Sequence, residues 1–357
     1  MPTTVRARSA QGGAEAAAAT PDPATLVRMY RAMALARALD DRIWKLSRQG
    51  AVPFAVTGRG QEAAQAALGA ALRAGIDYAY PYYRDVALVL MLGMTPGDVM
   101  LAAYGRAADP ASGGRQMPNH FSQPRLRIVS GSSPVATQIP QAAGTALACR
   151  LRGEDAAVLV TFGEGASSQG DFHEGCNFAA IHRLPVVFVC ENNGWAISVP
   201  ERLQVAPPGV AARAAAYGMP GEKVDGTDPV ATYRAAARAL ARARAGEGPS
   251  LLEVVVLRMD AHTSSDDDTT YRPAGDRAEM ARRDPLPRFR RRLLALRAAS
   301  QDELRAIDAA VAAEVDAATA AAEAHAAPEA ADLHRGVVAG RGAPAGRSGE
   351  AEEACGS

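Results

Sequence analysis

The sequence predicts an α/β fold with a mostly parallel sheet and helices on both of its faces. Two runs, residues 158–162 and 186–190, consist of consecutive β-branched and apolar residues without alternation. Such runs are typical of parallel strands that are buried on both faces. Residues 170–183 have the length and apolar spacing of a crossover helix, and the run LLEVVVL at 251–257 predicts a further strand. This arrangement places two loops at the carboxyl ends of neighbouring strands, where open α/β sheets bind ligands.

Apolar periodicity predicts further elements on either side of this unit. Asp22-Pro23 is a plausible helix start, because proline is favoured in the first turn. Residues 105–131 contain many glycines and prolines and no long periodic run, so we expect a long loop that is functional or disordered. The remaining pattern predicts helices at 22–49, 60–72, 86–92, 139–150, 211–217, 229–245, 276–296 and 301–326, and a strand edge with a turn at 223–228.

Composition sets the expected limits of the folded part. The 357 residues allow two domains, or one large α/β domain with appendages. Residues 1–21 and 327–357 are rich in small and charged residues and show no periodicity, so we expect both to be disordered tails. We therefore expect a single folded domain at residues 22–326.

Charge, hydropathy and cysteine usage exclude several classes of protein. The 39 basic and 39 acidic residues balance, so we expect no nucleic-acid partner and no anionic membrane surface. The first residues lack the apolar core of a secretory signal. No uninterrupted run of apolar residues approaches the length needed to span a membrane. The four cysteines show neither metal-binding nor disulfide spacing, which predicts a cytoplasmic protein in a reducing environment.

The two loops carry residues suited to a metal ion. Gly163-Glu164-Gly165 follows the first strand, and Asn192-Asn193 follows the second, one crossover unit later. A carboxylate, an amide oxygen and a backbone carbonyl are the hard oxygen ligands that Mg²⁺ prefers. The sequence therefore predicts that Glu164 and Asn193 hold Mg²⁺, which clamps a diphosphate.

The first loop has two other interpretations, an ordinary turn and a dinucleotide-binding loop. A glycine-rich loop after a strand is often an ordinary turn before a helix. A dinucleotide site would require the pattern G-x-G-x-x-G, but Ser168 stands at the third glycine position, and no P-loop motif is present. The paired loops favour the diphosphate interpretation over both.

This pair of loops resembles the signature of the thiamine diphosphate enzymes, a Gly-Asp-Gly loop followed by an Asn-Asn pair after about one βαβ unit. More closely, the chain resembles the alpha subunit of the decarboxylating component of branched-chain 2-oxo acid dehydrogenase complexes. Glu164 replaces the commoner aspartate, as it does in the branched-chain alpha subunits. The resemblance implies the thiamine diphosphate-binding fold, with thiamine diphosphate and Mg²⁺ as cofactors. It is collinear from about Leu26 to about Leu296 and is carried by residues 115–122, 132–144, 163–180 and 262–272.

The resemblance also implies roles for individual residues. His262 matches an active-site histidine on a mobile loop, and Thr263 stands where animal members carry a regulatory phosphoserine. From physics alone His262 could be surface decoration, and Tyr83-Arg84 a surface aromatic beside a solvated base. The resemblance places Trp195 as a backbone ligand of Mg²⁺ and Phe54 in the acyl pocket. Ser132, Thr137 and Gln138 stand where some members bind K⁺. The expected cofactor-binding residues are Tyr83, Arg84, Ser133, Val135, Gly163, Glu164, Gly165, Ala166, Asn193, Arg258 and His262.

The implied reaction is the oxidative decarboxylation of a branched-chain 2-oxo acid, with acyl transfer to the lipoyl group of a partner acyltransferase. In this family a separate beta chain supplies the glutamate that activates the cofactor, so we expect two alpha and two beta chains. The alternatives are a pyruvate or acetoin dehydrogenase alpha subunit, and a non-catalytic assembly subunit that keeps the fold. Animal branched-chain members carry arginine at the position of Glu191, whereas many bacterial relatives carry glutamate, so Glu191 is not among the expected site residues.

Overall fold

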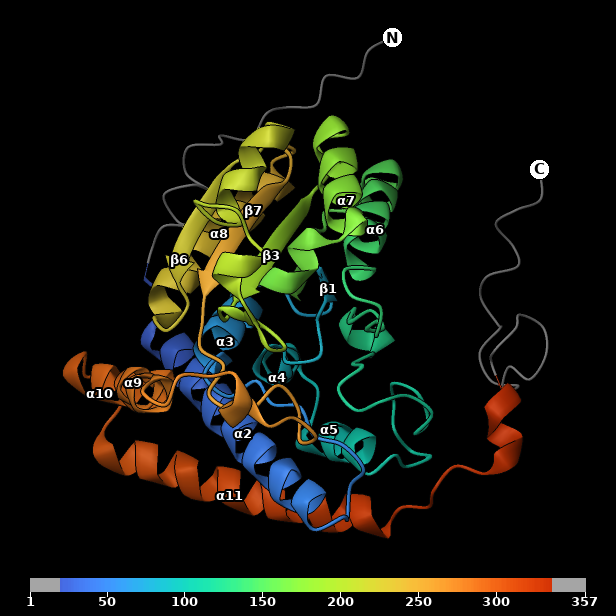
Figure 1. Cartoon of the computed structure of the whole chain (residues 1–357), viewed down its shortest axis with the longest axis vertical. Coiled ribbons are helices and arrows are strands. Elements are labelled where there is room, and N and C mark those ends of the chain that lie inside the picture. Colours follow the sequence, from blue (N-terminus) through green and yellow to red (C-terminus); the bar gives the residue numbers. More distant parts are fainter. Residues whose placement is uncertain (1–19, 336–357) are drawn as a thin grey trace.

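The computed structural model describes residues 20–335 (Figure 1). Its central sheet has five strands in the order β1-β2-β3-β7-β6, and every neighbouring pair is parallel. The predicted parallel sheet is therefore confirmed. The strands are β1 (Tyr78–Tyr80), β2 (Val158–Gly163), β3 (Val186–Asn192), β7 (Ser250–Val255) and β6 (Gly221–Asp225).

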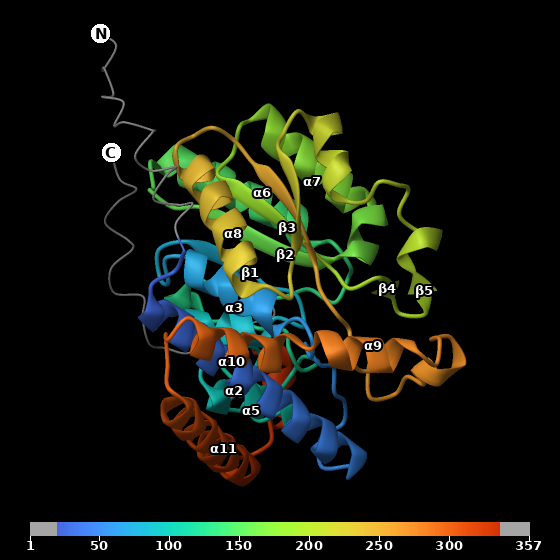
Figure 2. The same ribbon diagram turned by 90° about the vertical axis from the view of Figure 1, so that its left-hand side faces the viewer.

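Both faces of this sheet are buried, which explains the uninterrupted apolar runs. Leu159, Val187 and Val189 belong to one hydrophobic core, whereas Val160 and Phe188 belong to a second core on the opposite face. Figure 2 shows α8 on one side of the sheet and α6 and α7 on the other. The first core is closed by α2 (Pro23–Arg48), α3 (Glu62–Ala71), α4 (Val86–Leu92) and α8 (Pro229–Arg244), and the second by α6 (Gln138–Arg152) and α7 (Gly170–Ile181).

An outer layer of helices packs on α2. The helix α11 (Gln301–Ala324) lies against α2 and against α5 (Pro96–Ala103), a helix that the sequence analysis did not predict. The single helix expected at residues 276–296 is wrong, because it is divided into α9 (Asp276–Arg283) and α10 (Pro285–Ala295). Pro285 cannot donate a backbone hydrogen bond, and the carboxylate of Asp284 caps α10 by accepting from the Leu286 amide at 3.0 Å. The short helix expected at residues 211–217 is present as the 3-10 helix η4 (Ala211–Tyr217).

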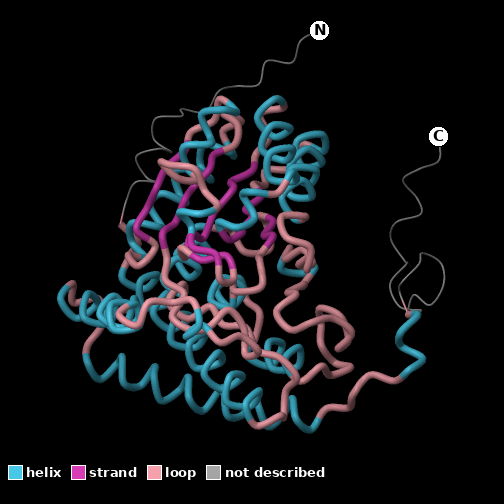
Figure 3. The backbone as a smooth tube through the Cα atoms, in the orientation of Figure 1, coloured by secondary structure: helices cyan, strands magenta, loops and turns pink. Residues whose placement is uncertain are grey.

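The long loops gather beyond the carboxyl ends of the strands, in the lower half of Figure 3. The segment 105–131 is one of them and contains only the short 3-10 helix η1 (Pro124–Leu126). A two-stranded antiparallel hairpin, β4 (Trp195–Ala196) and β5 (Val199–Pro200), follows β3 at the same end. The loops that carry the predicted site residues are therefore grouped at one edge of the sheet.

Ordered structure extends past Ala326, where we had expected a disordered tail to begin. Residues Ala330–His334 form the 3-10 helix η6. The Arg115 side chain donates to the carbonyl oxygen of Asp332 at 2.7 Å, which holds this segment against the loop 105–131. Residues 1–19 and 336–357, the rest of both predicted tails, lie outside the described residues. Within residues 20–335, no helix is long and apolar enough to cross a membrane.

Candidate active site

A cavity of about 450 Å³ lies at the carboxyl ends of β2 and β3. It brings together nearly all the residues predicted from the sequence. The exceptions are Thr137, which precedes α6, and Arg258, which lies behind Trp195. The predicted residues that line the cavity are Phe54, Tyr83, Arg84, Ser132, Ser133, Val135, Gln138, Gly163, Glu164, Gly165, Ala166, Asn193, Trp195 and His262.

The two loops that are predicted to hold a metal ion meet as their spacing predicts. Glu164 begins the 3-10 helix η2 (Glu164–Ser168) directly after β2, and its Oε2 accepts a hydrogen bond from the Asn193 backbone amide at 3.2 Å. The Asn193 side-chain oxygen in turn accepts from the Trp195 amide at 3.2 Å. Glu164 is only 1% exposed, and its Oε1 has no hydrogen-bond partner among the described residues. A buried unpartnered carboxylate oxygen beside an amide oxygen fits a bound dication.

Electrostatics supports the same reading of Glu164. Burial raises the pKa of its carboxyl above the ordinary value. A dication would reverse this effect by favouring the ionised form. Asn192 serves a different purpose, because its side-chain amide donates to Glu253 at 2.9 Å and to Glu201 at 2.8 Å, so it fixes the loop without facing the cavity.

Gly165 is required by a close approach of the chain. A Cβ atom at this position would lie 2.9 Å from the Cβ of Ala196 in the hairpin β4–β5. Only glycine therefore lets η2 pack against the hairpin that carries Trp195. At Gly165 the group that approaches the backbone is therefore this hairpin.

Two buried arginines beside the cavity have no carboxylate partner among the described residues. Arg84 is 1% exposed, and its guanidinium donates to the carbonyl oxygen of Thr57 at 2.6 Å and to His262. Arg258 is 2% exposed and donates to the hydroxyl of Tyr271 at 3.0 Å and to the carbonyl oxygen of Trp195 at 3.4 Å. Burial, followed by the charge of Arg84, lowers the pKa of Arg258. Two unneutralised buried cations provide a site for a polyanion.

His262 is held in one tautomer by Arg84. The Arg84 guanidinium approaches His262 Nδ1 at 3.0 Å and the His262 carbonyl oxygen at 3.1 Å. Because a guanidinium only donates, Nδ1 accepts and the neutral ring carries its proton on Nε2. Burial and the charges of Arg84 and Arg258 lower the pKa of His262 from 6.5 to about 4, so the ring is neutral at physiological pH.

This lowered pKa predicts that the loop around His262 loosens in acid. His262 binds a proton less readily in the ordered loop than in a loop that has opened to solvent. Neutral His262 therefore stabilises the ordered loop fully above pH 6.5, and this stabilisation is lost as the pH falls through about 4. We expect limited proteolysis of the loop 260–273 to accelerate over this range. The variant His262→Gln cannot titrate and should show a smaller acceleration; equal acceleration in both proteins would contradict the assignment.

Comparison with known proteins agrees with this geometry. Residues 30–331 match the protein family described as dehydrogenase E1 component. The chain belongs to the dehydrogenase E1 component family. It is 54% identical over 260 residues to the 2-oxoisovalerate dehydrogenase subunit alpha of Bacillus subtilis (strain 168), a match that covers 73% of this chain and 79% of the relative.

Two further relatives differ in the substrate that their names state. The chain is 42% identical over 266 residues to the 3-methyl-2-oxobutanoate dehydrogenase subunit alpha of Mycobacterium tuberculosis (strain CDC 1551 / Oshkosh), covering 74% of this chain and 70% of the relative. It is 41% identical over 267 residues to the pyruvate dehydrogenase E1 component subunit alpha of Staphylococcus aureus (strain Mu50 / ATCC 700699), covering 74% and 69%. Membership of the E1 component family implies thiamine diphosphate as cofactor, and a beta subunit and an acyltransferase as partners.

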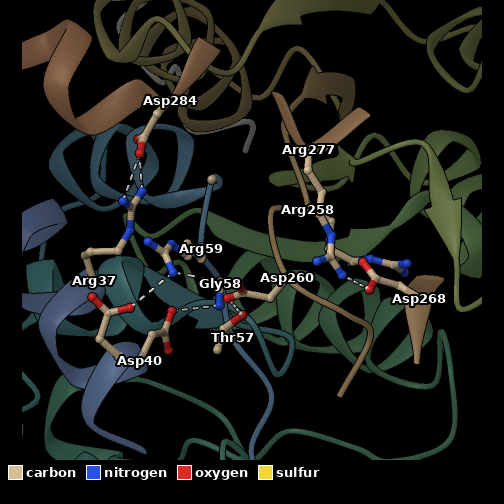
Figure 4. A network of polar contacts seen from close by, with 12 residues as sticks. Arg37, Asp40, Thr57, Gly58, Arg59, Arg258, Asp260, Asp268, Arg277 and Asp284 are labelled. Atoms are coloured by element: carbon tan, nitrogen blue, oxygen red, sulfur yellow. Dashed lines mark hydrogen bonds and ion pairs between the residues drawn. The ribbon is translucent and has the colours of Figure 1, made fainter. Parts of the chain in front are cut away.

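A network of polar contacts includes the segment that precedes Arg59 and the loop that follows Arg258 (Figure 4). The Gly58 amide donates to Asp40 at 2.9 Å, and the Thr57 hydroxyl donates to Asp260 at 2.9 Å. These bonds fix the segment whose Thr57 carbonyl accepts from Arg84. Asp268, one of the aspartates after His262, is itself buried and pairs with Arg272 at 3.0 Å, so it holds the loop together.

Several polar residues of this E1 component's cavity were not predicted from the sequence, among them Gln169, Gln204 and His120. His120 Nδ1 lies 2.9 Å from the carbonyl oxygen of Met117, so Nδ1 carries the proton. Its Nε2 then accepts a hydrogen bond from the Ser133 hydroxyl at 2.6 Å. The motif RQMPNHFS at residues 115–122 contains this histidine, and we had used the motif only for its resemblance. The pairing of His120 with Ser133 depends on the path of a long loop, which periodicity does not predict.

Proposed function

We propose that the cavity binds thiamine diphosphate through Mg²⁺ and that the chain is the alpha subunit of a branched-chain 2-oxo acid dehydrogenase. The observation that carries this proposal is a pair of buried arginines beside a buried carboxylate. Within residues 20–335 the arginines have no carboxylate partner and one oxygen of the carboxylate has no hydrogen-bond partner. Complementary charges of this kind are suited to a diphosphate and a dication bound together.

In this proposal the residues of the site have distinct roles in binding the metal ion, the diphosphate and the substrate. Glu164, Asn193 and the Trp195 carbonyl hold Mg²⁺. Arg84 binds the diphosphate together with Tyr83, whose ring centroid lies 5.0 Å from the guanidinium carbon of Arg84. When bound, thiamine diphosphate supplies the nucleophilic carbon and the electron sink for loss of CO₂. The neutral ring of His262 presents its Nε2–H, so it can donate a hydrogen bond to a reacting oxygen. Arg258 contributes its positive charge to the diphosphate site and also donates to the Trp195 carbonyl oxygen at 3.4 Å.

The remaining ligands and partners follow from the same proposal. Gln138 has a buried Oε1 without a hydrogen-bond partner among the described residues, which supports a K⁺ ion near Ser132 and Thr137. We expect two alpha and two beta chains, which pass an acyl group to a lipoyl-bearing acyltransferase. The buried free thiols of Cys149, Cys176 and Cys190 support a reducing, cytoplasmic location, and Cys355 lies outside the described residues.

The lining of the cavity predicts the substrate preference. Phe54, Val56, Met117 and Ile197 give it apolar walls, and a buried methylene in such a pocket changes kcat/KM by about tenfold or more. We therefore expect the enzyme reconstituted with its beta chain to favour 3-methyl-2-oxobutanoate over pyruvate in kcat/KM. The name of the Bacillus subtilis relative supports this expectation. An advantage of about tenfold for pyruvate would instead support the second candidate, a pyruvate dehydrogenase alpha subunit, for which the Staphylococcus aureus relative is named.

The same reconstituted enzyme tests the proposed activity. Lipoamide-dependent turnover of a 2-oxo acid should require added thiamine diphosphate and Mg²⁺. A complex that assembles with the beta chain but shows neither turnover nor cofactor binding would identify the chain as a non-catalytic assembly subunit.

A further inference from the structure

The loop that carries His262 pairs with residues 55–60, a segment from the N-terminal part of the chain. The two segments run antiparallel, because residue numbers rise along one as they fall along the other. Backbone amides of the loop donate to carbonyl oxygens of the segment at three places: Leu257 to Gly60 at 3.3 Å, Met259 to Arg59 at 3.2 Å, and Ser264 to Ala55 at 2.8 Å.

Two side-chain hydrogen bonds reinforce this pairing on either side of His262. The Thr57 hydroxyl donates to Asp260 Oδ2 at 2.9 Å, and the two residues lie side by side in Figure 4. The Ser264 hydroxyl oxygen accepts from the Ala55 amide at 3.0 Å. Ser264 therefore engages both backbone groups of Ala55, one through its own amide and the other through its hydroxyl.

The Ala55 amide depends on Ser264 for its hydrogen bond. Ala55 is 1% exposed, and its amide has no other partner within residues 20–335. A buried backbone amide without a partner is unfavourable. Removal of the Ser264 hydroxyl therefore disfavours the closed pairing relative to an opened loop, in which water reaches the amide.

Both paired segments contribute to the lining of the cavity. Phe54 and Val56, which flank Ala55, line it, and so does His262, two residues before Ser264. Neither Ala55 nor Ser264 belongs to the lining. The apolar wall and the histidine are therefore joined behind the cavity, through groups that leave its interior free for a ligand.

Arg84 joins the same two segments independently of Ser264. Its guanidinium donates to the Thr57 carbonyl oxygen at 2.6 Å, and it approaches His262 Nδ1 at 3.0 Å and the His262 carbonyl oxygen at 3.1 Å. None of these contacts uses the Ser264 hydroxyl. Loss of that hydroxyl therefore leaves in place the contacts that orient Arg84, the residue assigned to the diphosphate.

We propose that Ser264 is a positioning residue for substrate discrimination: it holds the loop of His262 against the wall that carries Phe54, so that pocket and loop close on the substrate as one unit. A branched acyl group that packs against Phe54 and Val56 then also stabilises the position of His262. Pyruvate presents only a methyl group to this wall and benefits less. The inference rests on the proposed function and names the residue through which the acyl pocket acts on the histidine.

The variant Ser264→Ala removes the acceptor for the Ala55 amide and should affect the two substrates unequally. In the enzyme reconstituted with its beta chain, we expect kcat/KM for pyruvate to fall by about fivefold, the effect of one lost hydrogen bond. The fall for 3-methyl-2-oxobutanoate should be larger by a further factor of about three or more, because the wall no longer helps to place His262. The dissociation constant of thiamine diphosphate should stay within about threefold of wild type.

Two control variants separate this link from a general disturbance of the loop. Ser265→Ala makes the same change one residue later, at an exposed serine whose side chain forms no hydrogen bond within residues 20–335, and should leave both kcat/KM values unchanged. Ser264→Thr keeps the hydroxyl and should restore most of the lost discrimination. Equal falls for the two substrates in Ser264→Ala, or a Thr variant as impaired as the Ala variant, would overturn the inference.

Hydrogen exchange tests the link without reference to activity. In Ser264→Ala, the peptides that contain Ala55 and His262 should both exchange faster, while α6 exchanges as in the wild-type protein. Unchanged exchange in both peptides would overturn the inference while the proposed function stands. If the wild-type enzyme neither binds thiamine diphosphate nor turns over a 2-oxo acid, the proposed function fails, and the exchange result still decides whether Ser264 joins the two segments.

Discussion

Replacing Glu164 with alanine is expected to weaken the binding of thiamine diphosphate by about 100-fold or more. Loss of a residue that only orients a metal ligand already lowers metal affinity by about 10- to 100-fold, and Glu164 is expected to be a ligand itself. The fold should survive, because the Glu164 side chain forms a single hydrogen bond within residues 20–335, which it accepts from the Asn193 amide. Removal of a buried carboxyl whose ionised form is disfavoured should not lower the melting temperature of the apo-protein. Titration calorimetry with Mg²⁺ and the beta chain measures the loss of affinity.

The matched control for this experiment is Glu164→Asp. It keeps the carboxylate and introduces the residue that is commoner in the thiamine diphosphate enzymes, so binding should be partly retained. If Glu164→Ala bound the cofactor as tightly as the wild type, Glu164 would not be a metal ligand, and the pairing of the loops after β2 and β3 would have no role in binding.

The second large effect is expected at Thr263, which lines the cavity next to His262. The loop is ordered by two hydrogen bonds from Arg84 to His262, and by Asp266, which accepts from the His262 amide at 2.7 Å. Thr263→Glu adds a carboxylate to the lining of the cavity, close to Asp266, where it would repel a diphosphate bound there. A phosphate there would add a still larger charge of about −1.5 to −2. We expect acyl transfer to lipoamide to be abolished at ordinary cofactor concentrations and the loop to become sensitive to protease.

Two further variants separate charge from shape. Thr263→Gln has the size of the glutamate variant without its charge and should retain most of the activity. His262→Ala removes the side-chain acceptor but leaves the His262 carbonyl bonded to Arg84, so it should lose activity without the added sensitivity to protease. Near-normal turnover in Thr263→Glu would mean that the loop stays away from the cofactor. It would also contradict the assignment of His262 as an active-site residue.

The parts of this molecule that the sequence predicts well are those governed by local patterns. Uninterrupted apolar runs predict strands buried on both faces, and the spacing between Glu164 and Asn193 predicts that their loops meet at one edge of the sheet. Asp22 caps α2 as expected, accepting from the Thr25 amide at 2.8 Å. Most of the site residues taken from the family resemblance also line one cavity, although their roles in binding remain predictions.

The parts that were missed depend on tertiary packing. The pairing of His120 with Ser133 requires the path of the loop 105–131, which no periodic pattern describes. Asn192 turns away from the cavity although it is adjacent to Asn193, because neighbouring residues at the end of a strand point in opposite directions. The pairing of Ser264 with Ala55 joins two segments far apart in the chain. None of these contacts leaves a signal in composition or spacing.

The central claim is that the cavity binds thiamine diphosphate through Mg²⁺ held by this chain. The most direct test is titration calorimetry of thiamine diphosphate into the chain assembled with its beta subunit, with Mg²⁺ present and then removed by chelation. We predict one cofactor bound per alpha chain, with binding lost when Mg²⁺ is removed. Absence of binding with Mg²⁺ present, or binding that chelation leaves unchanged, would contradict the account.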